Sequence, residues 1–235
     1  MPWLFNVTKP VALLAVAFSG LTSLSALADG GISLGVTRII YPQNSRQESL
    51  SINNSSSTAS FLVQSWVENA QGQKSSDFVA TPPLYVSGPK NENVLRLMKV
   101  RADLPGDRES LYYFVAKAIP AMDDKDKTSG GNVLRIAAAM RIKLFVRPAG
   151  LTPAVDKAPS ALSFHLAGGQ LEINNPTPYY ITLINMRVSN KHVEDTMVAP
   201  KNTTRVSLPA AGSSITFSTI NDYGGVSTPI SVGIN

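Results

Sequence analysis

Hydrophobic and polar residues alternate along most of the chain beyond its N-terminal segment, and one stretch keeps the alternation for an unusual length. From Val133 to Pro148 the sequence reads VLRIAAAMRIKLFVRP. Its even-numbered positions from Leu134 to Val146 are all apolar, whereas its odd-numbered positions include Arg135, Arg141, Lys143 and Arg147. Successive side chains of a strand point to opposite faces, so the pattern predicts a strand with one apolar and one largely cationic face.

The predicted strand is longer than an ordinary domain requires. At about 3.3 Å per residue, Leu134 to Val146 would span roughly 40 Å, against a usual strand of about five or six residues. Its apolar face can be interpreted in two ways: it completes the core of its own sheet, or it is kept for a partner. An open strand edge with a bare apolar face promotes aggregation unless it has a designated partner. The pattern alone leaves both interpretations open.

Shorter β-type runs, separated by turn residues, fill the chain before this stretch. Trp66 is the expected core aromatic of the third run. The regular spacing of these runs and the lack of a helical period predict an antiparallel sandwich of immunoglobulin type. The predicted strands are Gly31–Tyr41, Glu48–Asn53, Ala59–Asn69, Leu84–Val86, Val94–Val100 and Glu109–Ile119.

The composition changes after Pro148. Residues 149–160 are rich in alanine, proline and small polar residues, which is typical of an interdomain linker. A second set of β-type runs follows, so we expect an all-β protein with one domain over residues 29–150 and another over 151–235. The second set comprises Ala161–Leu166, Gln170–Asn174, Tyr179–Ser189, Glu194–Val198, Thr204–Leu208, Ser214–Ile220 and Val226–Ile234.

Residues 1–28 resemble a secretory signal peptide rather than a structural element. Lys9 gives a positive start, residues 11–18 form an apolar core, and Ala26-Leu27-Ala28 fits a cleavage site with small residues. The apolar run is too short and too broken to span a bilayer comfortably. We therefore predict export and removal of this segment.

The composition argues against most chemical functions. The formal net charge is +5, but the cations are scattered, which does not suit a nucleic-acid footprint. There is no cysteine, and the two histidines, His165 and His192, fall on separate predicted elements without the spacing of metal ligands. Asp123 to Asp126 resembles half a calcium loop but lacks the later acidic ligand. We expect no enzyme, metal, cofactor or small-molecule substrate.

A series of short motifs, spread in order over most of the chain, resembles the periplasmic pilus chaperones of the chaperone–usher pathway. Each motif alone is weak, but together they form a specific pattern. They are residues 35–42 (GVTRIIYP), 64–69 (QSWVEN), 80–83 (ATPP), 107–110 (DRES), 142–148 (IKLFVRP), 175–180 (NPTPYY) and 221–225 (NDYGG).

The resemblance implies two immunoglobulin-like domains arranged as an L or boomerang, with a binding cleft between them. By carry-over, Arg38 and Lys143 lie in the cleft and bind the C-terminal carboxylate of a pilin subunit, an arrangement suited to charge-assisted hydrogen bonds. The long strand would complete the subunit's unfinished sandwich, a mode of peptide recognition for which chaperone–pilin complexes are a known example. The side chains expected to fill the subunit's groove are Leu134, Ile136, Ala138 and Met140.

The resemblance also implies an ion-pair network between the domains, made by Glu109, Arg147 and Asp222. One position departs from the family pattern: Ala138 stands where many members have a bulkier apolar residue. The third pocket of a subunit should then be filled less well. The modest loop before the long strand and the absence of cysteine resemble the short-loop branch, which builds rod-like pili with tip adhesins.

The function implied by the resemblance is that of an ATP-independent periplasmic chaperone. It would bind, fold and cap pilin subunits and a tip adhesin, and deliver them to an outer-membrane usher. Weak self-association through the exposed strand is expected when no subunit is present. The alternatives are a secreted two-domain adhesive or structural protein with the long strand in its own core, and a β-sandwich metalloenzyme of the superoxide dismutase kind.

Overall fold

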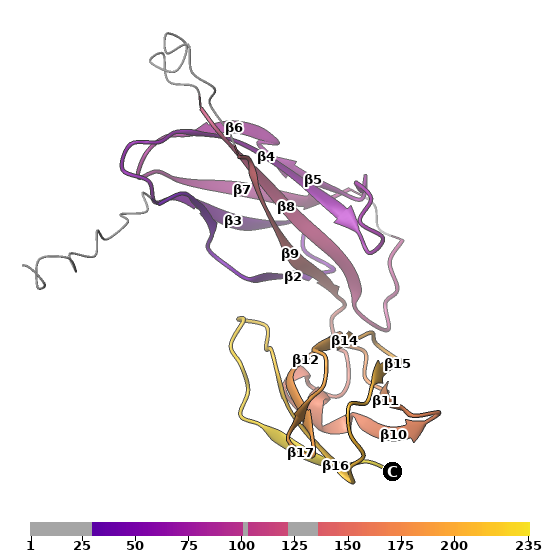
Figure 1. Cartoon of the computed structure of the whole chain (residues 1–235). Helices are drawn as coiled ribbons and strands as arrows, with labels where there is room; N and C mark the ends of the chain where they lie inside the picture. Colours follow the sequence, from indigo (N-terminus) through magenta and orange to yellow (C-terminus); the bar gives the residue numbers. More distant parts are fainter. Residues whose placement is uncertain (1–29, 101–102, 122–135) are drawn as a thin grey trace, which may run out of the picture.

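The computed structural model describes residues 30–100, 103–121 and 136–235, and these form two β-sandwiches joined at an angle (Figure 1). The predicted signal peptide at residues 1–28 and Leu134 lie outside the described residues. The strands of the N-terminal sandwich are β1 (Ile32–Leu34), β2 (Arg38–Pro42), β3 (Gln47–Asn54), β4 (Phe61–Asn69), β5 (Phe78–Thr81), β6 (Leu84–Ser87), β7 (Glu92–Lys99), β8 (Ser110–Pro120) and β9 (Ala138–Arg147).

Two sheets build the N-terminal sandwich. One has the strand order β1-β3-β7-β5 and the other β2-β9-β8-β4-β6. All the pairs are antiparallel except one: β2 runs parallel to β9, with Arg38 opposite Lys143. The expectation of a purely antiparallel sandwich was therefore wrong for this pair. The exception arises because β2 and β9 both run towards the second sandwich.

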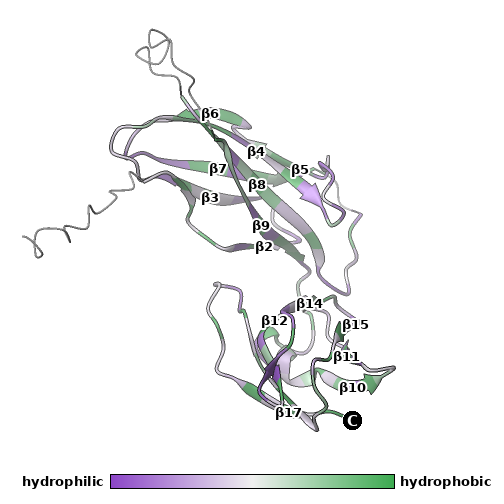
Figure 2. Cartoon of the chain, viewed as in Figure 1, coloured by the Kyte–Doolittle hydropathy of each residue, from purple (hydrophilic) through white to green (hydrophobic). Residues whose placement is uncertain are grey.

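The alternation of residue types accounts for the core between these sheets. Inward-facing residues of both sheets are almost fully buried, among them Tyr41, Ile52, Val63, Phe114 and Leu144. Figure 2 shows hydrophobic and hydrophilic bands following one another along the strands. A strand buried on one face only produces this pattern, because successive side chains alternate between the core and the solvent.

Two expectations about the N-terminal sandwich were wrong in detail. The stretch 31–41, expected as one strand, is divided between β1 in one sheet and β2 in the other. Trp66 is not in the core: it lies on the outward face of β4, half-buried, while Val63 and Val67 face inward. A strand that alternates strictly has only one core face, and Trp66 has the even-numbered parity of the outward one.

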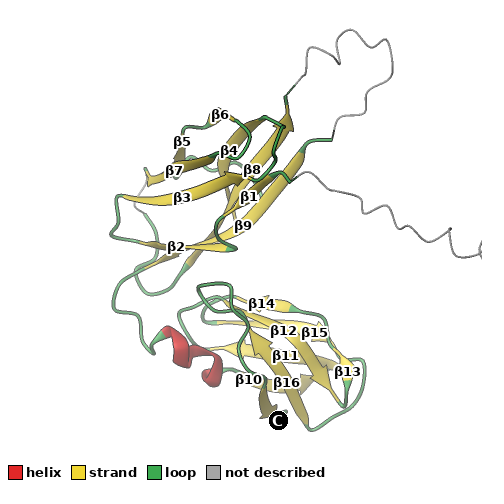
Figure 3. Cartoon of the chain, turned by 90° about the vertical axis from the view of Figure 1, so that its left-hand side faces the viewer, coloured by secondary structure: helices red, strands yellow, loops and turns green. Residues whose placement is uncertain are grey.

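The C-terminal sandwich follows a short linker that contains a helical turn. The turn, η1 (Val155–Ala161), is a 3₁₀ helix and lies beside the C-terminal sandwich, near β10, in Figure 3; the sequence predicted only an interdomain linker here. The strands are β10 (Ser163–Ala167), β11 (Gln170–Asn175), β12 (Ile181–Val188), β13 (Lys191–His192), β14 (Thr196–Val198), β15 (Asn202–Ser207), β16 (Ser214–Thr219) and β17 (Ile230–Gly233).

These strands form a second closed core. One sheet has the order β10-β11-β15, and the other has β13-β12-β16-β17, with β14 also pairing with β12. Phe164, Leu183 and Phe217 are fully buried between them. The two cores bear out the prediction of an all-β chain with two immunoglobulin-like sandwiches. Within the described residues, no helix has the length and apolar character needed to cross a membrane.

Candidate functional site

The strand β9 has two different surroundings along its length. On one side it pairs with β8 throughout, from Ala138 opposite Ala118 to Val146 opposite Ser110. On its other side it pairs with β2 only from Lys143 to Arg147. In the part of the chain that the structure describes, no strand occupies the second edge from Ala138 to Ile142. This segment is an open edge with unpaired backbone groups.

The apolar face of β9 changes from exposed to buried at the same point. Ile136 and Ala138 are exposed, Ile136 at 73%, and Met140 and Ile142 are partly buried against the core. Leu144 and Val146, on the same face, are almost fully buried. The second half of the strand therefore belongs to the core of its own domain, whereas the first half carries apolar side chains beyond it. Leu134, the remaining predicted groove-filling residue, falls outside the described residues.

The outward face of β9 carries three cations with different neighbours. Arg141 forms an ion pair with Glu68 of β4 at 2.8 Å. Arg147 forms ion pairs with Glu109 and Asp222. Lys143, between them, forms none with any carboxylate among the described residues. It is therefore the cation of this face that has charge left to bind an external anion.

Arg38 lies directly beside Lys143, at the start of β2, and likewise forms no ion pair within the described residues. Its Nη1 donates a hydrogen bond to the carbonyl oxygen of Ile220 at 3.0 Å, and Lys143 Nζ donates one to Thr182 Oγ1 at 3.2 Å. Both acceptors belong to the C-terminal sandwich. The structure thus brings the two predicted anchor residues together and supports each of them from the second domain.

The electrostatics of this pair favour an incoming anion. Burial, and then the nearby charge of Arg38, lower the pKa of Lys143 below its usual value. Burial also lowers the pKa of Arg38, against the opposing effect of Asp222 and Glu109. In addition, Arg38 Nε is buried without a hydrogen-bond partner. Two partly desolvated cations side by side repel each other, and a carboxylate between them would relieve that repulsion.

The predicted interdomain residues also meet. Arg147 Nε donates to Glu109 Oε1 at 2.7 Å, and its two terminal nitrogens donate to both oxygens of Asp222 at 2.6 and 2.7 Å. The second oxygen of Glu109 accepts a hydrogen bond from the backbone N–H of Tyr180 at 2.8 Å. Burial raises the pKa of Glu109, although Arg147 opposes the shift. The network joins the end of β9 to the C-terminal sandwich through a forked arginine.

The loop after β16 packs against the N-terminal sandwich. Asn221 Oδ1 accepts hydrogen bonds from the N–H groups of Tyr223 and Gly225, which closes the loop into a tight turn. Gly224 has φ +84° and packs so closely on Thr37 that a side chain there would collide with it. Glycine is therefore required at this position by both conformation and space.

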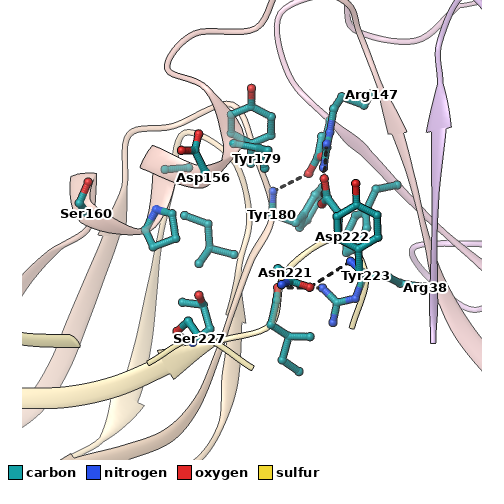
Figure 4. A pocket seen from close by; sticks show the side chains of 18 of the residues that line it. Arg38, Arg147, Asp156, Ser160, Tyr179, Tyr180, Asn221, Asp222, Tyr223 and Ser227 are labelled. Carbon is teal, nitrogen blue, oxygen red and sulfur yellow. Dashed lines mark hydrogen bonds and ion pairs between the residues drawn. The ribbon is translucent and has the colours of Figure 1, made fainter. Parts of the chain in front are cut away.

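A hollow of about 430 Å³ lies where the two sandwiches meet, and Arg38 forms part of its wall. Figure 4 shows Arg38 and Arg147 approaching it from the N-terminal sandwich, and Asn221, Asp222 and Tyr223 from the loop after β16. Lys143 is not among the residues that line it. Arg38 therefore borders a hollow between the two sandwiches, whereas Lys143 lies outside it.

The sequence did not reveal several partners in this region. Thr182 and Ile220, which hold the two cations, were not singled out, and neither was the ion pair between Asp107 and Lys201 at 2.6 Å that joins the two sandwiches a second time. These contacts cross from one domain to the other, where no spacing rule applies. Among the described residues, no cluster of three or more acidic or histidine side chains is placed to hold a metal ion.

Comparison with known protein families covers nearly the whole described chain. Residues 31–152 match the family model "Pili and flagellar-assembly chaperone, PapD N-terminal domain", and residues 157–231 match "Pili assembly chaperone PapD, C-terminal domain". Probable fimbrial chaperone SfmC of Escherichia coli K12 is 41% identical over 230 residues, which cover 97% of this chain and 100% of that protein. Chaperone protein FimC of the same strain is 40% identical over 236 residues, covering 97% of each chain.

Solved structures agree with these relatives. The periplasmic chaperone SfaE has a TM-score of 0.76 and 42% identity, over 86% of this chain and 98% of its own. The SafB chaperone of Salmonella enterica, solved in complex with the SafA pilin, has a TM-score of 0.79 and 28% identity, over 88% and 98%. The chain therefore belongs to the PapD-like family of pilus-assembly chaperones, which assist folding and assembly and are not enzymes.

Proposed function

We propose that this protein caps pilin subunits in the periplasm by lending them the open edge of β9. The observation that carries the proposal is the place of Arg38 and Lys143: two cations without carboxylate partners among the described residues, side by side where the open edge ends. A strand that occupied this edge would be stopped by the first residue of β2. Its terminal carboxylate would then lie beside the two cations.

The direction of the incoming strand follows from this position. If its C-terminus lies at Lys143 and its body follows β9 back towards Ala138, it runs parallel to β9, as β2 does. Backbone hydrogen bonds along the edge supply affinity, and alternate side chains supply specificity. Leu134, Ile136, Ala138 and Met140 would enter the groove of the subunit, each large one contributing about 1.5–3 kcal/mol before entropy costs. The small Ala138 would contribute least.

The wider cycle of the chaperone forms the second part of the proposal. Residues 1–28 would direct export, residues 29–150 would form the capping domain, and residues 151–235 would form the domain that supports the anchor. The clients would be pilin subunits and a tip adhesin, handed without ATP to an outer-membrane usher. Two copies without a client can cover their open edges by pairing weakly with each other. The SafB–SafA pilin complex is the relevant precedent among the similar structures.

The direct test is periplasmic affinity capture of subunits followed by mass spectrometry. The wild-type chain should recover pilins, and Lys143→Gln should weaken their binding by about tenfold to a hundredfold, the usual range for losing a charged hydrogen-bond partner. Lys191→Gln is the matched control, since Lys191 is an exposed lysine on β13. Thermal unfolding should be unchanged in both variants. Normal recovery of pilins by Lys143→Gln would refute the anchor.

A further inference from the structure

A client strand that binds through alternate side chains can also bind in one incorrect register with little change in its contacts. A slip of one residue would turn every side chain to the opposite face, but a slip of two residues keeps the faces and moves the strand by only about 6.6 Å. On β9 the residue two positions before Lys143 is Arg141, another cation on the same outward face. A client carboxylate that met Arg141 in place of Lys143 would be held in the slipped register.

The structure gives Arg141 a set of partners that Lys143 lacks. Its guanidinium lies 3.3 Å from the centroid of the Tyr113 ring on β8, and its Nε donates to Glu68 Oε2 at 2.8 Å. The other oxygen of Glu68 accepts a hydrogen bond from Trp66 Nε1 at 3.0 Å. The side chain of Glu68 is only 16% exposed. Arg141 is thus stacked, neutralised and fixed in one direction.

That direction leads away from the open edge. The sheet order is β2-β9-β8-β4, so the partners of Arg141 on β8 and β4 both lie on the side of β9 opposite to the edge that a client would take. Within the sheet, Arg141 lies opposite Val115. Lys143 lies opposite Tyr113 of β8, which in turn lies opposite Glu68 of β4. The arginine therefore reaches diagonally across β8, and its charge is turned away from the client.

We propose that Glu68 is a positioning residue that sets the register of the bound subunit by withholding Arg141 from the subunit's carboxylate. The inference rests on the proposed function, since it concerns which cation binds the same carboxylate. The charge pattern of β9 then offers one unneutralised cation on this face, Lys143, and one acceptable register. Trp66 and Tyr113 act through Glu68 and Arg141, the first by orienting the carboxylate and the second by stacking on the guanidinium.

Glu68→Gln is the informative variant. The glutamine side chain has the same shape and can still accept the hydrogen bond of Trp66, but it no longer neutralises Arg141. Arg141 then becomes free to bind a carboxylate. The ion pair is partly solvent-exposed on the arginine side, where Arg141 is 43% exposed, so its strength is modest and we expect the fraction of complexes in the slipped register to rise by up to about fivefold. Total capture should change little, because the slipped complexes are also bound.

The absence of cysteine from the chain makes the register directly measurable. Ala139→Cys places a thiol on the exposed outward face of the open edge, and cysteines placed one at a time along the last strand of a captured pilin report which residue lies opposite. With Glu68 present, one client position should crosslink best. With Glu68→Gln, crosslinking should increase at the position two residues nearer the client's C-terminus.

The double variant Glu68→Gln/Arg141→Gln is the matched control, because it removes the competing cation and should restore the single crosslink. An unchanged crosslinking pattern in Glu68→Gln, in a sample that still captures the pilin through Lys143, would overturn the register proposal alone. Failure of the Ala139→Cys chain with Glu68 intact to crosslink at any position would instead overturn the proposed function, and the register proposal with it. A changed pattern that persists in the double variant would show that Arg141 is not the competitor.

Discussion

Lys143 lies between two other cations on one face of β9, and its neighbours rather than its residue type make it the proposed anchor. Arg141 has Glu68, and Arg147 has Glu109 and Asp222, so their charges are compensated inside the protein. Among the described residues, Lys143 donates a side-chain hydrogen bond only to the hydroxyl of Thr182, and it lies beside a second cation, Arg38. Partial burial makes this arrangement unfavourable until an anion arrives.

This arrangement predicts that client binding depends on pH in the alkaline range. In the free protein the pKa of Lys143 is lowered by burial and by Arg38, whereas a bound carboxylate would favour the charged form and raise that pKa again. Between these two values the complex holds more protons than the separate partners, so affinity should fall as pH rises through the window and be independent of Lys143 below it.

Titration calorimetry with a captured pilin, from neutral pH to about pH 10, measures this fall. Lys143→Arg is the comparison, because a guanidinium stays charged throughout that range. The variant should bind with a much flatter pH profile. An equally steep fall in both proteins would mean that another group is responsible.

Among single residues, the sequence allowed the proposed anchor pair to be named, but it did not show which cations have carboxylate partners. Arg38 and Lys143 were placed by the resemblance of short motifs, and the structure brings them together. The pairing of Arg141 with Glu68 could not be read from the sequence, because the two residues are 73 positions apart and meet only through the order of three strands. Pattern rules describe neighbours within a strand and not contacts across a sheet.

At the scale of the element, β9 combines a core strand and an exposed strand in one continuous segment. Its apolar face is the same from Ile136 to Val146, but the core of the domain covers only the later part. The alternation predicted the strand and its faces correctly from Ala138 onwards, but it placed the start too early, since Ile136 lies before β9. It could not show where burial ends, since that depends on where β2 begins on the neighbouring side. The same limit explains why the stretch 31–41 was not predicted to divide between two sheets.

This division predicts that substitution by aspartate affects stability very differently at two positions on the same face. Ile136→Asp should change the free energy of unfolding by less than about 0.5 kcal/mol, as for an ordinary surface substitution, while abolishing pilin capture. Leu144→Asp should leave no stably folded protein, because it places an unpaired carboxylate in a sealed core. Chemical denaturation and the capture assay together measure both effects.

The comparison also separates the chaperone from a two-domain adhesive or structural protein. If the first half of the strand were packed in the protein's own core, Ile136→Asp would unfold it as Leu144→Asp does. Ile136 is 73% exposed, which already disagrees with that alternative.

At the scale of the whole molecule, two groups of ion pairs among the described residues join the sandwiches, and they differ in burial. Arg147 links Glu109 and Asp222 in a site where the Glu109 side chain is 1% exposed. Asp107 and Lys201, the second group, are 52% and 41% exposed. Breaking a buried pair leaves an uncompensated charge, whereas an exposed pair is replaced by water. The buried group should therefore hold the angle between the domains.

Glu109→Ala should lower the free energy of unfolding by about 3 kcal/mol and broaden the distribution of domain orientations. Thermal denaturation measures the first effect, and small-angle X-ray scattering the second. Asp107→Ala is the control and should leave both the unfolding midpoint and the scattering curve unchanged. Equal effects of the two substitutions would contradict a special role for the buried network.

The two proposed anchor residues depend on contacts with both sandwiches. Arg38 and Lys143 come from the first sandwich, but the atoms that hold them, Ile220 O and Thr182 Oγ1, come from the second. The proposed anchor would therefore be complete only when the C-terminal sandwich has folded. A truncated or half-folded copy would expose the open edge of β9 without a complete anchor for the carboxylate of its client. A copy whose C-terminal sandwich has not folded should therefore bind clients less tightly than a fully folded copy.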